Sequence, residues 1–202
     1  EPNTVFGRIH KKGNLKVPSD SEAQKIDLET NRFLKNNGFS RYEISSYSLP
    51  GHTSRHNRMY WSGSGWWGFG MGATSAPWGE RFSRPRTIAG YKNWVEQQES
   101  QCLEKTLYLE ESSPMPLDEL LMIGLRRREG VHLMELARDF GWTKKECDTN
   151  LKLLEKYWIT FLNEGYLLKK NGRYILSDPR GMQISNQILI QMFLWWDSLG
   201  LD

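Results

Sequence analysis

The sequence predicts an α/β segment followed by a mainly helical, winged-helix-like domain. A helical apolar pattern begins near Ser21 and ends at Asn37-Gly38, and alternating residues typical of a strand come next. Helix followed by strand is half of a βαβ unit. After residue 116, three helical patterns precede two short strand patterns, which is the order of a winged-helix module. We therefore expect two domains, 1–107 and 117–202, joined by a linker over 108–116.

Composition narrows the class of protein. Of the 202 residues 38% are hydrophobic, and the mean hydropathy of -0.64 is typical of a soluble protein. No apolar run approaches the roughly eighteen residues that a membrane span needs. The net charge of +3 predicts no polyanionic partner. Cys102 and Cys147 offer neither a disulfide framework nor a metal-ligand spacing, which favours a reducing, cytoplasmic compartment.

The first half is predicted to alternate loops with regular elements. We expect a loop over 1–19, where prolines and glycines interrupt polar residues, and then a helix capped by Asp20 or Ser21. Residues 39–47 are predicted to form one strand. Seven glycines between Pro50 and Pro85 exclude a long helix there, although 66–73 could form a short buried strand.

The rest of the chain is predicted to be largely helical. Helices are expected over 88–107, 117–127 and 133–140. Another begins at Thr143, whose hydroxyl and Glu146 form a capping-box pattern. Short strands over 166–168 and 173–176 flank Asn171-Gly172, a strong hairpin signal, and a last helix is expected over 182–199.

The segment His56-Asn57-Arg58-Met59-Tyr60-Trp61 combines an imidazole, an amide and two large aromatic rings. An imidazole can bind a haem iron axially, and aromatic faces can cover a macrocycle. In the alternative interpretation, these residues form a loop in which His56 and Asn57 bond to the backbone and Trp61 fills a gap in the core. Chemistry alone leaves both interpretations open.

The segment 68–75, GFGMGATS, allows a close approach of backbone, because small residues leave room for another backbone or a ligand. It does not fit the dinucleotide fingerprint GxGxxG. Three arginines in the loop that follows could receive carboxylates or phosphates, or could simply be solvated: Arg81, Arg84 and Arg86. The run 126–128, RRR, follows a predicted helix, whose C-terminal end favours cations.

Four ordered blocks give the chain a family resemblance: EPxTxFG at the start, GFxRYEIS over 38–45, PGHxSRHNxxYW over 50–61, and GFGxGAxS over 68–75. With these blocks the chain resembles the oxygen-independent coproporphyrinogen III oxidase-like radical SAM proteins, and within them the haem-chaperone (HemW) branch. The segment LRRREGV over 125–131 extends the resemblance to the C-terminal domain. Ser46 departs from the family, which usually has Asn after EIS.

The resemblance implies a fold, namely the α/β end of a partial (β/α) radical SAM barrel followed by a closing, mainly α, winged-helix-like domain. It also implies a [4Fe-4S] cluster and S-adenosylmethionine in the parent protein. The family's cluster motif CxxxCxxC is absent here, and three thiolates must converge on one cluster. The chain begins with Glu1-Pro2 and without a signal segment. We therefore interpret it as a C-terminal fragment that lacks the N-terminal radical SAM half and is inactive alone.

The same resemblance assigns the sites. His56 becomes the candidate haem-iron ligand, and three residues are expected to shape the haem pocket: Asn57, Tyr60 and Trp61. Five residues are expected to face S-adenosylmethionine: Gly70, Gly72, Ala73, Thr74 and Ser75. No catalytic residue and no cluster ligand is expected in this chain.

Three functions follow as hypotheses. The first is a radical SAM haem chaperone that binds haem or a porphyrin and passes haem to client proteins, in the cytoplasm or in a plastid stroma. The second is an oxidase that decarboxylates coproporphyrinogen III. The third takes the winged-helix-like end as a nucleic-acid binder, and the low net charge and the acidic Glu146, Asp148 and Glu155 on its third helix argue against it.

Overall fold

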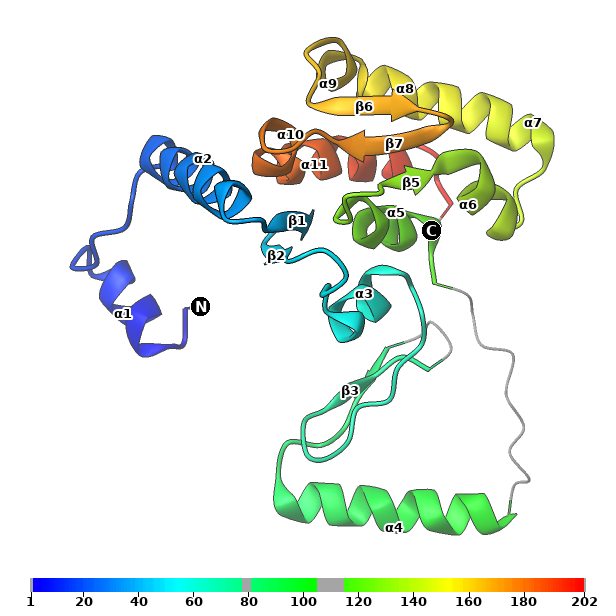
Figure 1. Ribbon diagram of the computed structural model, residues 1–202. Helices are drawn as coiled ribbons and strands as arrows, with labels where there is room; N and C mark the ends of the chain where they lie inside the picture. Colours follow the sequence, from blue (N-terminus) through cyan, green and yellow to red (C-terminus); the bar gives the residue numbers. More distant parts are fainter. Residues whose placement is uncertain (1, 78–80, 105–114, 202) are drawn as a thin grey trace.

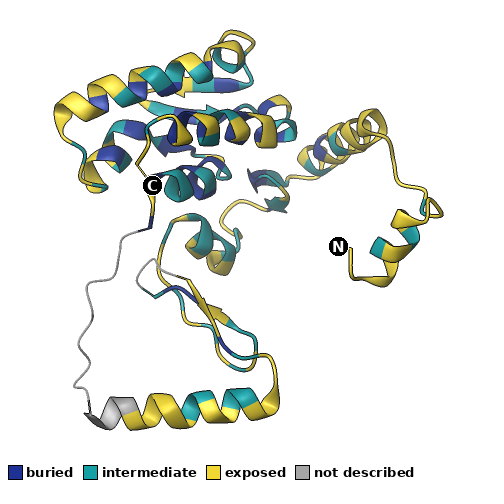
Figure 2. Cartoon of the chain, turned by 180° about the vertical axis from the view of Figure 1, so that it is seen from behind, coloured by how far each residue is buried: buried dark blue, intermediate teal, exposed yellow. Residues whose placement is uncertain are grey.

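The computed structural model describes residues 2–77, 81–104 and 115–201. Figure 1 shows that the elements after residue 115 pack into one body, while α1 and α2 extend to its left and α3, β3 and α4 lie below it. In Figure 2 buried residues gather in that C-terminal body and in the hairpin beside it, and the outlying helices are mainly exposed. The hydrophobic core therefore lies in the second half of the chain.

The predicted loop over 1–19 is partly wrong, because Val5–Lys11 forms helix α1. The Thr4 hydroxyl caps this helix by accepting a hydrogen bond from the Gly7 amide at 3.0 Å. The capping threonine is visible in the sequence, but Gly7 inside the segment argued against a helix. No residue of α1 is buried, and Phe6 is 69% exposed.

The helix predicted to follow residue 19 is confirmed as α2 (Asp20–Asn36). Its cap is Ser19 rather than Asp20 or Ser21. The Ser19 side chain accepts from the Glu22 amide, and the Glu22 carboxylate accepts from the Ser19 amide at 2.8 Å, so the two form a capping box. Gly38, with φ of +81°, follows the helix and ends it.

Helix α2 turns a polar face toward the rest of the protein. Asn31 is its buried residue, and Asp27 lies one turn before it on the same side. The apolar Ile26 and Phe33 are 54% and 67% exposed. Hydrogen bonds and ion pairs, rather than apolar burial, therefore attach this helix to its neighbours.

The single strand predicted over 39–47 is wrong, because the segment folds back on itself. Strands β1 (Ser40–Glu43) and β2 (Ser46–Ser48) pair antiparallel, with Arg41 opposite Tyr47. The register shifts between Arg41 and Glu43, so β1 carries an irregularity before the turn. Among the described residues no parallel strand completes the βαβ unit expected from the helix and strand patterns.

The glycine-rich segment is a loop, and the strand predicted over 66–73 is wrong. Helix α3 (Arg55–Trp61) precedes it, and β3 (Thr74–Ser75) pairs with β4 (Phe82–Ser83) after it. Gly70 and Gly72 have φ of +90° and +68°, which an extended strand does not use. Helix α4 (Ile88–Glu104) follows, and residues 105–107 of the predicted helix lie outside the described residues.

The C-terminal body contains the following elements: α5 (Leu117–Leu125), β5 (Val131–His132), α6 (Leu133–Asp139), α7 (Lys144–Glu146), the π-helical η1 (Cys147–Leu151), α8 (Lys152–Tyr157), α9 (Ile159–Asn163), β6 (Leu167–Lys170), β7 (Arg173–Leu176), α10 (Arg180–Gln183) and α11 (Ser185–Asp197). The capping box of Thr143 and Glu146 is confirmed. The helix expected to begin there changes to a π turn in η1 and continues as α8. Trp158 ends α8 and precedes α9. The last predicted helix is likewise broken at Ile184.

Strands β5, β7 and β6 form an antiparallel sheet in that order. The hairpin predicted at Asn171-Gly172 is confirmed, since both residues have positive φ, 49° and 76°, as a two-residue type I′ turn requires. Strand β5 was not predicted, because two residues are too short to show a period.

The core of this body is rich in aromatic rings. Trp158 and Trp195 are fully buried, and their indole nitrogens donate to the carbonyls of Ile188 and Asn150 at 3.1 and 2.9 Å. The elements of this body follow the order helix, strand, helix, helix, strand, strand. The winged-helix-like assignment and the partial barrel both stay predictions. Most of the predicted linker, residues 108–114, lies outside the described residues.

Candidate functional site

The HNRMYW segment forms helix α3 rather than a loop. Ser54 caps it by accepting a hydrogen bond from the Asn57 amide at 3.2 Å. Residues three and four apart are neighbours on a helix, so His56, Tyr60, Asn57 and Trp61 follow one another around a broad arc of α3 in that order. The four residues predicted to contact haem therefore share one short helix, with His56 on one side of the arc and Trp61 on the other.

On the first side, aromatic rings form a row. The rings of His56 and Tyr60 meet edge to face with centroids 4.9 Å apart, and Tyr60 meets Trp66 in the same way at 4.8 Å. His56 is exposed, and among the described residues its imidazole has no hydrogen-bond partner. An unused imidazole beside aromatic rings is chemically suited to ligate a haem iron and cover the macrocycle.

On the second side, α3 meets the C-terminal body. The guanidinium of Arg126 lies over the Trp61 ring, 4.3 Å from its centroid, and its Nη2 lies 3.6 Å from Glu43 Oε2. Glu43 and Trp61 come from the neighbouring blocks YEIS and HNRMYW, whereas Arg126 comes from LRRREG, more than sixty positions later. We call the cluster formed by these three residues and their neighbours Arg58, Arg127 and Glu129 the arginine junction.

A second ion pair belongs to the arginine junction. Arg58, also on α3, pairs with Glu129, which follows the end of α5. Burial works to raise the pKa of Glu129, but hydrogen bonds from its own backbone and from Arg58 outweigh it, so the pKa is lowered. The Glu129 carboxylate is thus kept charged beside Arg58.

The glycine-rich loop uses most of its own polar groups. Ser75 is fully buried, and its hydroxyl accepts from the Gly68 amide at 3.0 Å and from Arg84 Nη1 at 2.7 Å. The Thr74 and Ser83 hydroxyls bond to each other at 2.8 Å. The Gly72 amide donates to the Pro85 carbonyl at 3.0 Å.

Close approach of backbone at this loop is therefore confirmed, but the approaching chain is the protein itself. A Cβ on Gly68 would overlap the Thr74 carbonyl, and the amide of Ala73 already donates to Gly70. Gly70 has open space around it. That these residues face S-adenosylmethionine stays a prediction, because the hydroxyls of Thr74 and Ser75 are already engaged within the loop.

The three loop arginines have different surroundings. Arg84 is 6% exposed and lies over the Trp94 ring at 5.1 Å in addition to bonding Ser75. Arg81 is 46% exposed in its side chain and pairs with Glu119 at 3.5 Å. Arg86 is exposed. Arg84 is therefore neither solvated nor free to bind an anion, and it stabilises the loop itself.

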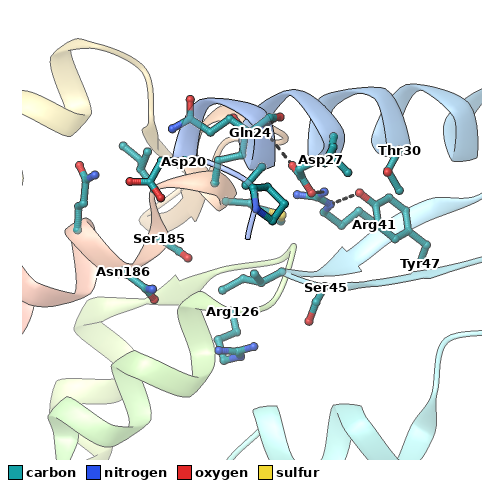
Figure 3. A pocket seen from close by; sticks show the side chains of 18 residues that line it. Asp20, Gln24, Asp27, Thr30, Arg41, Ser45, Tyr47, Arg126, Ser185 and Asn186 are labelled. Carbon is teal, nitrogen blue, oxygen red and sulfur yellow. Dashed lines mark hydrogen bonds and ion pairs between the residues drawn. The ribbon is translucent and has the colours of Figure 1, made fainter. Parts of the chain in front are cut away.

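An open cavity of about 860 Å³ lies elsewhere, between α2, the β1–β2 hairpin and the start of α11. Figure 3 shows Asp27, Arg41 and Tyr47 at one end of it and Ser185 and Asn186 at the other. None of the residues predicted to face haem or S-adenosylmethionine lines this cavity. Sequence reasoning missed it because its walls come from segments more than a hundred positions apart.

The described residues do not fit an iron–sulfur cluster. No group of three or more His, Cys, Asp or Glu side chains that could hold a metal ion occurs among them. Cys147 is buried, and burial raises the pKa of its thiol, so the thiolate that a cluster needs is disfavoured. Within the part of the chain that the structure describes, no helix is long and apolar enough to cross a membrane.

The chain matches proteins named heme chaperone HemW along nearly its whole length. The protein from Synechocystis sp. is 36% identical over 96% of this chain, and that from Lactococcus lactis is 26% identical over 96%. The chain is a sequence relative of the HemW proteins. This confirms the resemblance drawn from the four motif blocks. The chain spans about half the length of these HemW relatives, 49% and 48% respectively.

The HemW resemblance extends to a eukaryotic protein. "Radical S-adenosyl methionine domain-containing protein 1, mitochondrial" from Danio rerio is 26% identical over 94% of this chain, which covers 41% of that protein. No protein-family model and no solved structure matches the chain.

Proposed function

We propose that this chain supplies the haem-contacting part of a HemW-like haem chaperone, which binds haem and delivers it to client proteins. The observation that carries the proposal is the match to HemW proteins over 96% of the chain, together with an exposed His56 on the helix formed by HNRMYW. Haem is the cargo in this function. His56 is the proposed axial ligand of its iron.

The surroundings of His56 support this role. Tyr60 and Trp66 extend an aromatic surface from the imidazole, against which a flat macrocycle can lie. Trp61 lies on the side of α3 that meets Arg126, so we propose that it supports the helix, and that Asn57, a neighbour of Tyr60, borders the haem pocket. The relatives from Synechocystis sp. and Lactococcus lactis are named heme chaperones, which favours the chaperone over the oxidase alternative.

In the parent protein, S-adenosylmethionine and a [4Fe-4S] cluster would supply radical chemistry. Cys147, whose side chain the structure describes, is buried with a raised pKa and does not fit that cluster. We propose that the loop over 70–75 lies toward S-adenosylmethionine through the open space beside Gly70, since the neighbouring hydroxyls are engaged. The partial barrel and the winged-helix-like domain remain part of this proposal.

Haem titration of the chain with His56→Ala tests the proposal. We expect haem affinity to fall at least about tenfold, the loss typical even of groups that only support a metal ligand, and the absorption spectrum to lose its imidazole-ligated form. The matched control is His52→Ala, since His52 is also exposed and lies four positions earlier, before the helix. Unchanged affinity and spectrum in His56→Ala would reject the ligand assignment, as would an equal effect in His52→Ala.

A further inference from the structure

Helix α3 is short and has no buried residue of its own. Two turns of helix are not stable in isolation, so contacts with other segments must fix its orientation. The turn after α3 touches α5, where a Cβ on Gly63 would lie 2.9 Å from a methyl of Leu120. Beyond that turn, α3 meets the C-terminal body through the arginine junction.

At the arginine junction, Arg126 makes the contact that depends most on its chemistry. Its planar guanidinium lies 4.3 Å from the centre of the Trp61 ring, a geometry that suits stacking. The same group reaches toward Glu43, whose side chain is only 3% exposed. Arg126 is the residue directly after α5, so the end of a core helix presents it to α3.

The polar atoms of the arginine junction are incompletely bonded. Five of its buried side-chain atoms lack a hydrogen-bond partner among the described residues: Glu43 Oε2, Trp61 Nε1, Arg126 Nε, Arg127 Nε and Glu129 Oε2. By contrast, the indoles of Trp158 and Trp195 in the core are fully bonded. Native proteins leave few buried polar atoms without a hydrogen bond. Their concentration here indicates that charge and ring stacking, rather than a complete hydrogen-bond network, hold α3 in position.

We infer that Arg126 is a positioning residue that holds α3, and with it His56, in a fixed orientation against the C-terminal body. Stacking on Trp61 fixes one end of the helix, and the Arg58–Glu129 pair fixes its middle. Glu43 keeps the Arg126 guanidinium from turning toward solvent. Arg126 would hold α3 whether or not haem is bound. Only the effect on haem binding through His56 rests on the proposed function.

The test compares three variants of the chain. Arg126→Met removes the charge and the planar group, and Arg126→Lys keeps the charge without the stacking plane. Arg128→Met is the matched control, because Arg128 lies on the same turn and is exposed. Amide hydrogen exchange over 55–61 reports the hold on α3 without haem, and amides of α8 serve as an internal reference for folding. Haem titration then reports the consequence at His56.

We expect Arg126→Met to raise exchange over 55–61 about tenfold relative to α8, Arg126→Lys to give an intermediate rise, and Arg128→Met to give none. Haem affinity should fall in the same order. Unchanged exchange over 55–61 in Arg126→Met, or an equal rise in Arg128→Met, overturns the inference. If exchange rises while haem affinity stays constant, Arg126 does not position His56, which also overturns it.

Two further outcomes are separable. If the unmodified chain binds no haem, the proposed function fails, and the exchange data still decide whether Arg126 holds α3. If Arg126→Met loses protection in α8 as well, Trp61→Leu replaces it, since this change removes the same contact from the α3 side. Faster exchange confined to 55–61 in Trp61→Leu then supports the inference, and unchanged exchange rejects it.

Discussion

The side-chain amide of Asn31 donates to the carboxylate of Asp178 at 2.9 Å, although 147 positions separate the two residues. The same carboxylate pairs with Lys35 at 3.0 Å and lies 3.7 Å from Arg41 Nε. Arg41 is 2% exposed and also pairs with Asp27 at 2.5 Å. Asp178 therefore connects α2 and β1 to the segment between β7 and α10.

Replacing Asp178 should loosen this connection. Asp178→Ala leaves the buried Arg41 and Asn31 with fewer partners, and we expect the free energy of unfolding to fall by about 1–3 kcal/mol. Lys35→Ala is the control. The Lys35 side chain is 47% exposed, so its ion pair with Asp178 should contribute only about 0–1 kcal/mol. Urea denaturation measures both. Equal losses in the two variants would contradict the buried role of Asp178.

Tyr174 should make stability fall at alkaline pH. Burial, and then its hydrogen bond with Glu155, raises the pKa of Tyr174 to about 12 from an ordinary value near 10. The unfolded chain therefore loses this proton first, so the stabilisation is complete below pH ~10 and is lost as the pH rises toward ~12. Tyr174→Phe should remove this part of the pH dependence, together with the last tyrosine to ionise in an ultraviolet titration. A late tyrosine that persists in Tyr174→Phe would contradict the assignment.

The same cluster should act with the opposite sign in acid. Burial works to raise the pKa of Glu155, but hydrogen bonds from Lys169 and Tyr174 outweigh it, so the pKa is lowered. Its stabilisation is present above the unfolded pKa of about 4.3 and is lost as the pH falls through the folded value. Glu155→Gln should therefore flatten the acid limb of a stability–pH curve. A limb that keeps its slope in this variant would assign acid sensitivity to other carboxylates.

The capping box before α7 gives a prediction with a close control. Thr143→Ala removes the hydroxyl that accepts from the Glu146 amide, and it should lower stability by about 1 kcal/mol. Thr149→Ala changes the same residue type at an exposed position within η1, where alanine is at least as good a helix former. Thermal unfolding should separate the two variants. A Thr149→Ala loss as large as that of Thr143→Ala would argue against the cap.

The hairpin between β6 and β7 depends on Gly172 for two reasons. Its φ is +76°, and a Cβ there would lie 2.5 Å from Nε2 of His132. Gly165 has a similar φ of +73° but open space around it. We expect Gly165→Ala to cost about 1 kcal/mol through its backbone alone and Gly172→Ala to cost more, as measured by urea denaturation. Equal costs would mean that His132 moves aside freely.

Local signals in the sequence predicted several elements correctly. The capping box at Thr143, the Asn171-Gly172 turn and helix α2 each depend on residues within a few positions of one another, which is why their chemistry is visible in the sequence. The breaks at Trp158 and Ile184 were missed, since tertiary packing around buried indoles decides where those helices end.

The candidate site was predictable in its residues but not in its arrangement. The motif blocks indicated His56 and Trp61, but the segment was not predicted to be a helix, so its spacing could not show how the two residues project. The contact of Trp61 with Arg126 joins positions 65 apart by numbering, and only a folded chain brings them together. The inward polar face of α2 was also hidden, because its apolar residues suggested the opposite side.

The arginine junction also limits how this protein can be recombined with its relatives. A chimera that takes 40–61 from one relative and 126–129 from another would combine a tryptophan, two arginines and two glutamates that were not selected together. Such a hybrid keeps its C-terminal core, since that core does not use these residues. The two segments should therefore be exchanged together, although more than sixty residues of chain run between them.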